Sequence, residues 1–219
     1  MIHKLFITPW FGPLPEWWPQ YAAQMERLRE HGYEWLIERN LEAFQERCLR
    51  KLGVRPPIVA GGSKSHDLRP MLGYLYEAEL RGYDFWGFTD FDVVYGRVQD
   101  WVTDEFLSKL DVHSNHHSYM CGPWSLLRNT AEARNLFLFV PGWREKVLDP
   151  NVNGWGEHGW SREIESKQHG LRVAYTYWQG NDRDLHPEFL EMRDGGKLWH
   201  PDIGELTMFH FRQTKRWPL

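Results

Sequence analysis

The pattern of apolar and polar positions along this chain changes period several times. Short apolar runs bounded by Gly, Pro or polar residues predict buried strands, at residues 5–8, 33–37, 56–60, 85–88, 171–178 and 206–211. Apolar residues three and four positions apart predict amphipathic helices, at residues 20–30, 41–52, 67–81, 100–110 and 129–139. Strands that alternate with helices over short connections are typical of an α/β fold. We therefore expect a mostly parallel central sheet flanked by helices, in one domain spanning residues 1–219.

Three stretches do not fit this alternation. Residues 111–127 carry His113, His116 and His117 close to Cys121, but their spacing matches no standard zinc motif, so we interpret them as polar positions of an exposed strand. Residues 154–160 contain three glycines and two tryptophans, which predicts an irregular loop. Residues 179–193 are polar and predict a long loop or flap.

The segment at residues 83–96 carries the candidate chemistry. A buried strand ends there in Thr89-Asp90-Phe91-Asp92 and is followed by a second apolar run. Residues i and i+2 of an extended chain point to the same side, so Asp90 and Asp92 would face one site while Phe91 faces the core. Two carboxylates on one side suit Mg²⁺ or Mn²⁺. The alternative for an isolated D-x-D is a solvated turn, but the apolar runs on both sides disfavour it.

A second candidate feature lies in the last predicted strand. His210 stands in an apolar run and is followed by Arg212, Lys215 and Arg216. A neutral imidazole could complete a metal site that already holds two carboxylates. Without the acids upstream, His210 would be interpreted as a buried core histidine.

Bulk properties narrow the function classes. The chain has 219 residues, 42% of them hydrophobic, which suits one globular domain with a sizeable core. A net charge of −4 gives no basic field for nonspecific binding to a phosphate backbone. Two cysteines make no disulfide framework, and neither a signal peptide nor a transmembrane run is recognisable, so we expect a cytoplasmic protein.

The motif residues resemble a known family. D-x-D after a hydrophobic strand is the hallmark of metal-dependent nucleotide-sugar glycosyltransferases of the GT-A fold. The string GYDFWGFTDFDVVYGRV resembles "GYDFWGYCDIDVIYGDI" of a glycosyltransferase family from bacterial capsule and lipopolysaccharide clusters. Residues 64–70 and 122–129 are similar to that family's "YKLCDYKP" and "GHFTLYRN", and the carboxyl end to its "HFQKR". The end is also similar to the H-x-x-G-x-x-K-P-W pattern of glycogenin-like enzymes, although its Gly and Pro are missing here.

The resemblance implies a division of labour along the chain. Residues 1–110 would form the nucleotide-sugar half, and residues 111–219 the acceptor half with a tail that binds metal and diphosphate. Asp90, Asp92 and His210 would hold Mn²⁺ or Mg²⁺, with Asp90 on the metal or on the donor ribose. The other donor-binding residues implied are Thr8, Trp10, Phe11, Asp67, Lys215 and Arg216. Asp67 could instead simply cap a helix.

The acceptor site is expected in the Gly-Trp loop. Its glycines would allow close approach, Trp155 would offer a flat face, and Glu157 and His158 could contact a hydroxyl. An inverting enzyme would need a general base, for which Glu157, Asp182 and Asp184 are all candidates. The glycogenin-like ending favours retention instead, so the stereochemistry stays open.

The expected function is therefore transfer of a sugar from a nucleotide-sugar, with UDP as the expected nucleotide, to a glycan. Two alternatives stay open. One is a phage-type glycosyltransferase that modifies hydroxylated bases in DNA. The other is a non-catalytic sugar-binding or scaffold protein on the same fold.

Overall fold

The computed structural model describes residues 1–151, 154–167 and 169–214. Within these residues the central sheet has six strands in the order β2-β1-β3-β6-β5-β7. Their bounds are β1 (Lys4–Pro9), β2 (Tyr33–Glu38), β3 (Phe85–Phe88), β5 (Val112–Ser114), β6 (Ser125–Arg128) and β7 (Val173–Tyr175). Strand β1 is parallel to β2 and β3, and β5 is parallel to β7, whereas β6 is antiparallel to both of its neighbours. The predicted α/β class, a central sheet flanked by helices, is confirmed.

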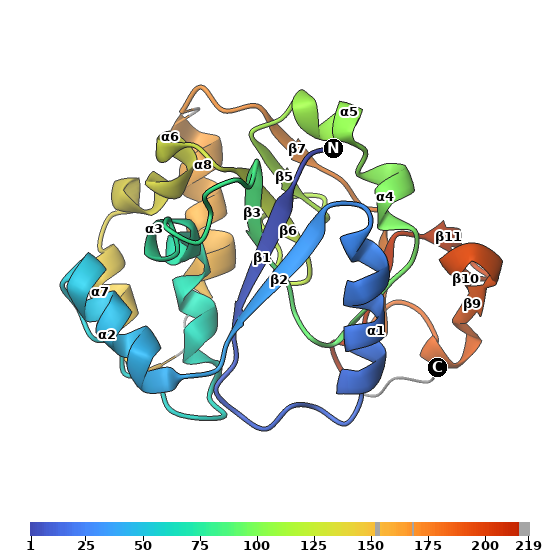
Figure 1. Ribbon diagram of the computed structural model, residues 1–219, viewed down its shortest axis with the longest axis horizontal. Helices are drawn as coiled ribbons and strands as arrows, with labels where there is room; N and C mark the ends of the chain where they lie inside the picture. Colours follow the sequence, from blue (N-terminus) through green and yellow to red (C-terminus); the bar gives the residue numbers. More distant parts are fainter. Residues whose placement is uncertain (152–153, 168, 215–219) are drawn as a thin grey trace.

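Helices cover both faces of the sheet (Figure 1). One face carries α1 (Trp18–Arg29), α4 (Val98–Trp101) and α5 (Asp104–Ser108). The opposite face carries α2 (Leu41–Leu52), α3 (Leu72–Leu75), α6 (Ala131–Arg134), α7 (Trp143–Leu148) and α8 (Trp160–Lys167). Each face buries its own apolar cluster, so the sheet is a shared wall between two cores.

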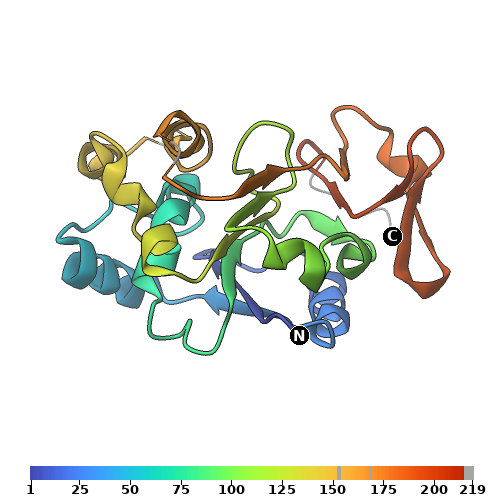
Figure 2. The same cartoon turned by 90° about the horizontal axis from the view of Figure 1, so that it is seen from above.

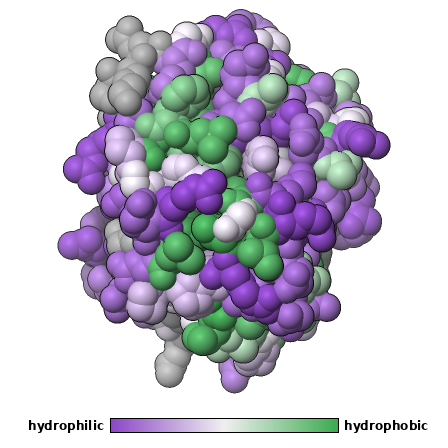
Figure 3. All heavy atoms as spheres, turned by 90° about the vertical axis from the view of Figure 1, so that its left-hand side faces the viewer, coloured by the Kyte–Doolittle hydropathy of each residue, from purple (hydrophilic) through white to green (hydrophobic). Residues whose placement is uncertain are grey.

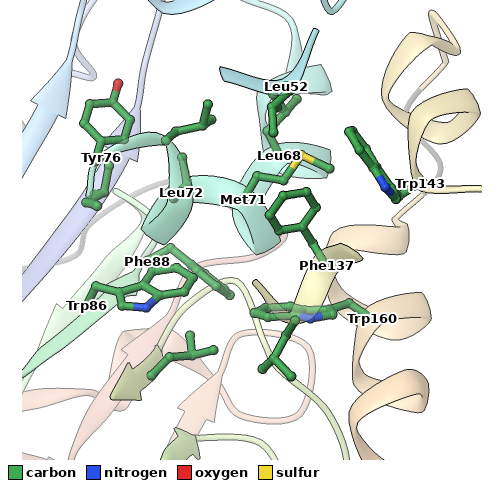
Figure 4. Packing of buried hydrophobic residues seen from close by; sticks show 14 of the residues in the cluster. Leu52, Leu68, Met71, Leu72, Tyr76, Trp86, Phe88, Phe137, Trp143 and Trp160 are labelled. Carbon is green, nitrogen blue, oxygen red and sulfur yellow. The ribbon is translucent and has the colours of Figure 1, made fainter. Parts of the chain in front are cut away.

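The larger core is built from aromatic and aliphatic side chains of both layers (Figure 4). Trp86 and Phe88 project from β3 and are less than 2% exposed, as are Leu72 and Met71 on the facing helical segment. Gly73 lets that segment approach closely, because a Cβ at this position would lie 2.3 Å from the indole of Trp86. Several of the tryptophans are therefore used for packing.

Helix α2 shows how local signals set an element. Its apolar residues Phe44, Cys48 and Leu52 share one buried face. The side chain of Asn40 accepts a hydrogen bond from the amide of Ala43 and caps the first turn. Gly53 ends the helix with φ 71° and ψ 17°, a left-handed conformation. The predicted bounds of this helix are confirmed.

Other predicted elements differ from the structure. Residues 56–60 form no strand, because Pro56 and Pro57 lack the amide donors that a sheet ladder needs. The helix expected from Asp67 is instead a 3-10 helix, η1 (Ser63–Met71), followed by the short α3. Pro70 within it cannot donate the hydrogen bond of an α-helix. Asp67 lies inside η1, so the prediction that it caps a helix is wrong.

The second half of the chain also holds differences. His113 is fully buried on β5, so it is not a polar position of an exposed strand. The predicted Gly-Trp loop is a π-helical turn, η3 (Trp155–Gly159), which leads directly into α8. The predicted helix at residues 129–139 is divided into α6 and the 3-10 helix η2 (Leu136–Phe139), with Thr130 as the cap. The helix expected at residues 100–110 is likewise divided, into α4 and α5.

Two small sheets, each three-stranded within the described residues, lie beside the main sheet (Figures 1 and 2). One joins β4 (Val93–Tyr95), β12 (Met208–His210) and β8 (Gln179–Asn181). The other joins β9 (Glu191–Arg193), β10 (Lys197–His200) and β11 (Gly204–Leu206). The prediction of a polar loop at residues 179–193 is therefore only partly right. Packing of Leu190, Leu198 and Phe209 forms a third, smaller core.

The outer surface of the helices α2 and α7 is mixed in polarity. Apolar patches on this side are interrupted by hydrophilic residues (Figure 3). Leu49 on α2 and Leu148 on α7 are 45% and 47% exposed. Within the described part of the chain, no helix combines the length and apolar character needed to cross a membrane.

Candidate active site

The D-x-D segment follows the carboxyl end of β3, the edge of an α/β sheet at which ligands commonly bind. Thr89, the residue before Asp90, is held in place because its hydroxyl donates a hydrogen bond to the carbonyl of Pro123 at 2.7 Å. Phe91 is 2% exposed and packs against the rings of Trp10, Trp18 and Tyr21. The predicted inward orientation of Phe91 is confirmed. It leaves Asp90 and Asp92 directed away from this aromatic cluster.

Strand pairing brings His210 to these acids. Strand β12 is antiparallel to β4, and His210 is paired with Val93, directly after Asp92. The amide of Phe211 donates to the carbonyl of Asp92 at 2.8 Å and extends this pairing past the strand end. His210 Nε2 consequently lies 3.4 Å from Asp92 Oδ1. Residues far apart in the sequence thus meet at one point.

Asp90, Asp92 and His210 form a cluster that could hold a metal ion. One donor atom from each residue lies within 4.8 Å of the others. An octahedral Mg²⁺ or Mn²⁺ ion with bonds of about 2.1 Å places opposite ligands about 4.2 Å apart, so a small contraction would let all three bind one ion. Two carboxylates and one imidazole also have the chemistry that these ions accept. The residues fit the metal.

Arg69 joins the cluster to a further acid. Its guanidinium donates one hydrogen bond to Asp90 Oδ1 and another to Glu157 Oε1. The Arg69 side chain is 6% exposed, whereas those of Asp90 and Glu157 are 18% and 29% exposed. Burial opposes the charge of Arg69, but the two carboxylates outweigh burial and raise its pKa. The guanidinium therefore stays charged and fixes both acids.

Gly122 packs closely over these three side chains. A Cβ at this position would lie 2.4 Å from the guanidinium of Arg69 and 2.7 Å from a carboxylate oxygen of both Asp90 and Glu157. No side chain could be accommodated there without displacing the ion-pair network.

A cavity of about 390 Å³ opens beside the acids. One wall is aromatic and belongs to the segment after β1, with Trp10, Phe11 and Trp17. Polar lining comes from η1 and the turn before it, with Ser65 and His66. A cavity of this size with one flat apolar wall and a few polar groups suits a nucleotide-sized ligand.

His66 lies in this cavity between groups of opposite charge. Burial, assisted by the nearby Arg69, lowers the pKa of His66 to about 4 although Asp90 and Asp92 oppose the shift. The imidazole is therefore neutral at physiological pH, with the capacity both to donate and to accept a hydrogen bond.

Some of the predicted donor-binding residues line the cavity and others do not. Thr8, Trp10 and Phe11 line the cavity together with Asp90 and Asp92. Asp67 does not line it. Its carboxylate is 1% exposed and forms an ion pair with Lys64 at 2.9 Å. Lys215 and Arg216, predicted to bind the diphosphate, lie outside the described residues.

The predicted acceptor residues also differ in their positions. Trp155 is 2% exposed and belongs to the large core, so the prediction that its ring stacks on a sugar is wrong. The π-helical turn directs this indole inward, whereas Glu157 is half-buried and His158 is exposed. Glu157 is held beside Asp90 by Arg69, and His158 is exposed and contacts the ring of Tyr119 at 4.2 Å.

The two other candidate bases are placed near the carboxyl end. Asp182 accepts hydrogen bonds from the amides of Gln213 and Thr214 and from the Thr214 hydroxyl. Burial opposes its charge, but these bonds outweigh burial and lower the pKa of Asp182, which makes it a weak base. Asp184 is exposed and accepts a hydrogen bond from Asn181 at 2.8 Å.

Sequence reasoning missed Arg69, His66 and Gly122. Arg69 stands in the same heptapeptide as Asp67, so the motif at residues 64–70 was a signal for its position but not for its contacts. Gly122 opens the resembling stretch at residues 122–129, but that resemblance does not indicate its close approach to the acids.

Comparison with protein families gives one match. The model of a family of unknown function (DUF6625) matches residues 35–145. The chain belongs to this family. The matched range contains Arg69, Asp90 and Asp92 but neither Glu157 nor His210. Among curated proteins no sequence matches the chain.

Among solved structures, the fold is similar to the crystal structure of a glycosyltransferase involved in the glycosylation of the major capsid of PBCV-1. The similarity covers 95% of this chain and 94% of that chain, with 13% sequence identity and a TM-score of 0.45. A TM-score below 0.5 carries no weight for function, which must come from the site.

Proposed function

We propose that this protein is a metal-dependent glycosyltransferase that uses a nucleotide-sugar donor, with UDP as the nucleotide. The observation that carries the proposal is the meeting of Asp90, Asp92 and His210 beside a cavity of about 390 Å³ with an aromatic wall. The cavity would take the nucleoside, and the cluster would hold Mn²⁺ or Mg²⁺ next to the diphosphate.

Each group of the site has a role in this reaction. Trp10 and Phe11 would face the base, while Thr8 lies near the carboxyl end of β1 and lines the cavity. When bound, the metal would offset the negative charge that develops on the leaving diphosphate. Arg69 would keep Asp90 in place as that charge changes. Lys215 and Arg216 remain proposed diphosphate ligands from the sequence.

The acceptor side is proposed to lie around Glu157. Its carboxylate is positioned beside Asp90 and is partly exposed, so it could bind or deprotonate an acceptor hydroxyl. Glycosyl transfer passes through a transition state with oxocarbenium character, which a nearby carboxylate stabilises. Asp184 is the remaining candidate base. The hydrogen bonds that Asp182 accepts make Asp182 a poor candidate for this role.

The proposal is tested with Asp92→Asn. Loss of an outer-shell partner typically weakens metal binding by roughly 10–100-fold. Loss of a direct ligand should weaken Mn²⁺ binding by at least this factor. Isothermal titration with Mn²⁺ measures this, and release of UDP from a panel of UDP-sugars measures donor hydrolysis. The exposed Asp194→Asn is the matched control and should behave like the wild type.

Two results would contradict the proposal. One is hydrolysis of a UDP-sugar at the full rate in EDTA, which would remove the metal from the mechanism. The other is equal Mn²⁺ affinity in Asp92→Asn and wild-type protein, which would assign the carboxylates a purely structural role.

A further inference from the structure

A continuous row of aromatic rings lies at the surface on the Glu157 side of the site. It runs from Tyr177 through His117, His116 and Tyr119 to His158. Neighbouring ring centroids are 5.6, 4.2, 3.8 and 4.2 Å apart in that order. We refer to these five residues as the aromatic row.

Three separate segments supply the aromatic row. His116, His117 and Tyr119 belong to the connection between β5 and β6, Tyr177 follows β7, and His158 belongs to the π-helical turn. Tyr177, His117 and His158 are exposed, and the other two rings are half-buried. Convergence of aromatic rings from three segments on the surface, rather than in a core, is typical of a binding surface.

The aromatic row is next to the candidate active site. His158 directly follows Glu157, whose carboxylate shares Arg69 with Asp90. Burial, together with the charge of Glu157, raises the pKa of Tyr119 to about 12. Arg212, two residues after the candidate ligand His210, is also close enough to influence Tyr119 and His116. The aromatic row therefore extends outward from the reacting centre.

The charges around the aromatic row favour a neutral, hydroxylated ligand. Burial, assisted by His117, lowers the pKa of His116 to about 4, so this ring is uncharged at neutral pH. A carboxylate stands at each end, with Glu157 near Tyr119 and Asp184 near Tyr177, and the guanidinium of Arg212 near Tyr119 and His116 lies between these acids. Carboxylates accept hydrogen bonds from sugar hydroxyls but repel phosphates, whereas a nucleic-acid strand needs a cationic track.

A cavity of about 340 Å³ adjoins the end of the aromatic row near the active site. It is lined by Tyr119 and His158 of the row together with Ser118, Ser161 and Arg162. Hydroxyl, imidazole and guanidinium groups next to flat rings combine stacking faces with hydrogen-bond donors and acceptors.

We propose that the aromatic row is the binding surface for a glycan acceptor, whose sugar rings stack on Tyr119 and Tyr177 while the terminal hydroxyl reaches Glu157. This inference names the acceptor class of the proposed glycosyltransferase and rests on that proposed function. It replaces the buried Trp155 as the stacking surface of the acceptor site.

The experiment is binding of the full chain to an array of immobilised oligosaccharides, with single-stranded DNA spotted on the same surface and EDTA in the buffer. Wild-type protein should bind at least one oligosaccharide. The double variant Tyr119→Ala, Tyr177→Ala should bind it at least about tenfold more weakly, since each removed ring face contributes to stacking. The double variant Tyr119→Phe, Tyr177→Phe keeps both faces and should retain most of the binding.

Phe139→Ala serves as the matched control, because Phe139 is an exposed aromatic residue on η2, 53% accessible and outside the aromatic row. It should bind like the wild type. The proposal is overturned if no oligosaccharide binds, if the Tyr→Ala double variant binds as well as the wild type, or if only DNA binds and depends on the row.

Donor hydrolysis separates this proposal from the previous one. Release of UDP from a UDP-sugar with Mn²⁺, measured on wild-type protein and on Phe139→Ala, reports the donor site alone, because the cavity beside the acids contains no residue of the aromatic row. If wild-type protein hydrolyses no UDP-sugar but still binds oligosaccharides through the aromatic row, the donor proposal fails while the glycan surface stands.

Discussion

Arg69 is the side chain on which two acids of the site depend. It lies almost completely buried, and each of its two terminal nitrogens contacts a different carboxylate. Planar guanidinium groups suit such bridging because their donors have fixed directions. Removing this cation would leave Asp90 and Glu157 close together without a neutralising partner.

We predict that Arg69→Leu lowers the free energy of unfolding by about 3 kcal/mol, the lower end of the cost of breaking a buried pair because both carboxylates are partly exposed. Urea unfolding at pH 7 measures the change. Arg55→Leu is the control, since Arg55 also bridges two acids, Glu42 and Glu46, but is 40% exposed. Its loss should cost clearly less than the loss of Arg69, because solvent screens exposed ion pairs. Equal costs for the two variants would argue against a special role of the buried bridge.

At the residue scale, the i, i+2 spacing was enough to predict that the side chains of Asp90 and Asp92 point to the opposite side from the side chain of Phe91. The cluster with His210 follows from the sequence only as a hypothesis, because it depends on the register of β12 on β4. The orientation of Trp155 could not be predicted. Three neighbouring glycines indicated a loop, whereas the chain forms a π-helical turn that directs the indole into the core.

At the scale of single elements, β5 carries a group that links stability to pH. His113 is fully buried, contacts the rings of Phe106 and Trp178, and shares a hydrogen bond of 3.0 Å with Thr176. Burial lowers its pKa to about 3, well below the value of about 6.5 expected in the unfolded chain. The folded protein therefore excludes a proton that the unfolded chain takes up.

We predict that the free energy of unfolding falls as the pH is lowered from 6.5, because only the unfolded state then binds the proton. Between pH 6.5 and 5 His113 alone should account for about 2 kcal/mol of this loss. Urea unfolding as a function of pH measures it, and well above pH 6.5, where the unfolded imidazole is also neutral, His113 should have no effect on the slope.

His113→Gln tests the assignment. The variant should be less stable at pH 7 but should lose less stability on acidification than the wild type. Part of the acid loss should persist, since the pKa values of His66 and His116 are also lowered. An identical pH dependence in variant and wild type would exclude His113 as a source.

Elements with strong local signals were predictable, and those set by tertiary contacts were not. Helix α2 has a cap, a regular apolar face and a terminal glycine, and its bounds followed directly. Residues 63–75 have a helical apolar pattern, but Pro70 and the close contact of Gly73 with Trp86 divide them into a 3-10 helix and one α-turn. Strand β9 is fully exposed and has no apolar alternation to reveal it.

At the scale of the whole molecule, the candidate metal ligands join two parts of the fold. Asp90 and Asp92 follow the central strand β3, and His210 belongs to the small sheet formed with β4 and β8. A ligand that binds only the folded state stabilises it. The α/β class was predictable from alternating elements. The antiparallel direction of β6 was not, because it is set by the pairing of β6 with β3 and β5.

We predict that Mn²⁺ raises the melting temperature. At 100 times the dissociation constant the gain in stability is about 2.7 kcal/mol, which corresponds to roughly 5–10 °C for a chain of this size. Differential scanning fluorimetry with and without Mn²⁺ measures the shift. Asp92→Asn should show almost none, and a shift of equal size in that variant would place the stabilising ion elsewhere.

The pairing of β12 with β4 has a consequence for how the protein is made. During synthesis the aspartates leave the ribosome long before His210, yet the third donor is added only when β12 docks beside Val93. Domains generally fold as units while the chain emerges. A nascent chain that has completed its central sheet would therefore still lack the assembled cluster, which would form in one late step.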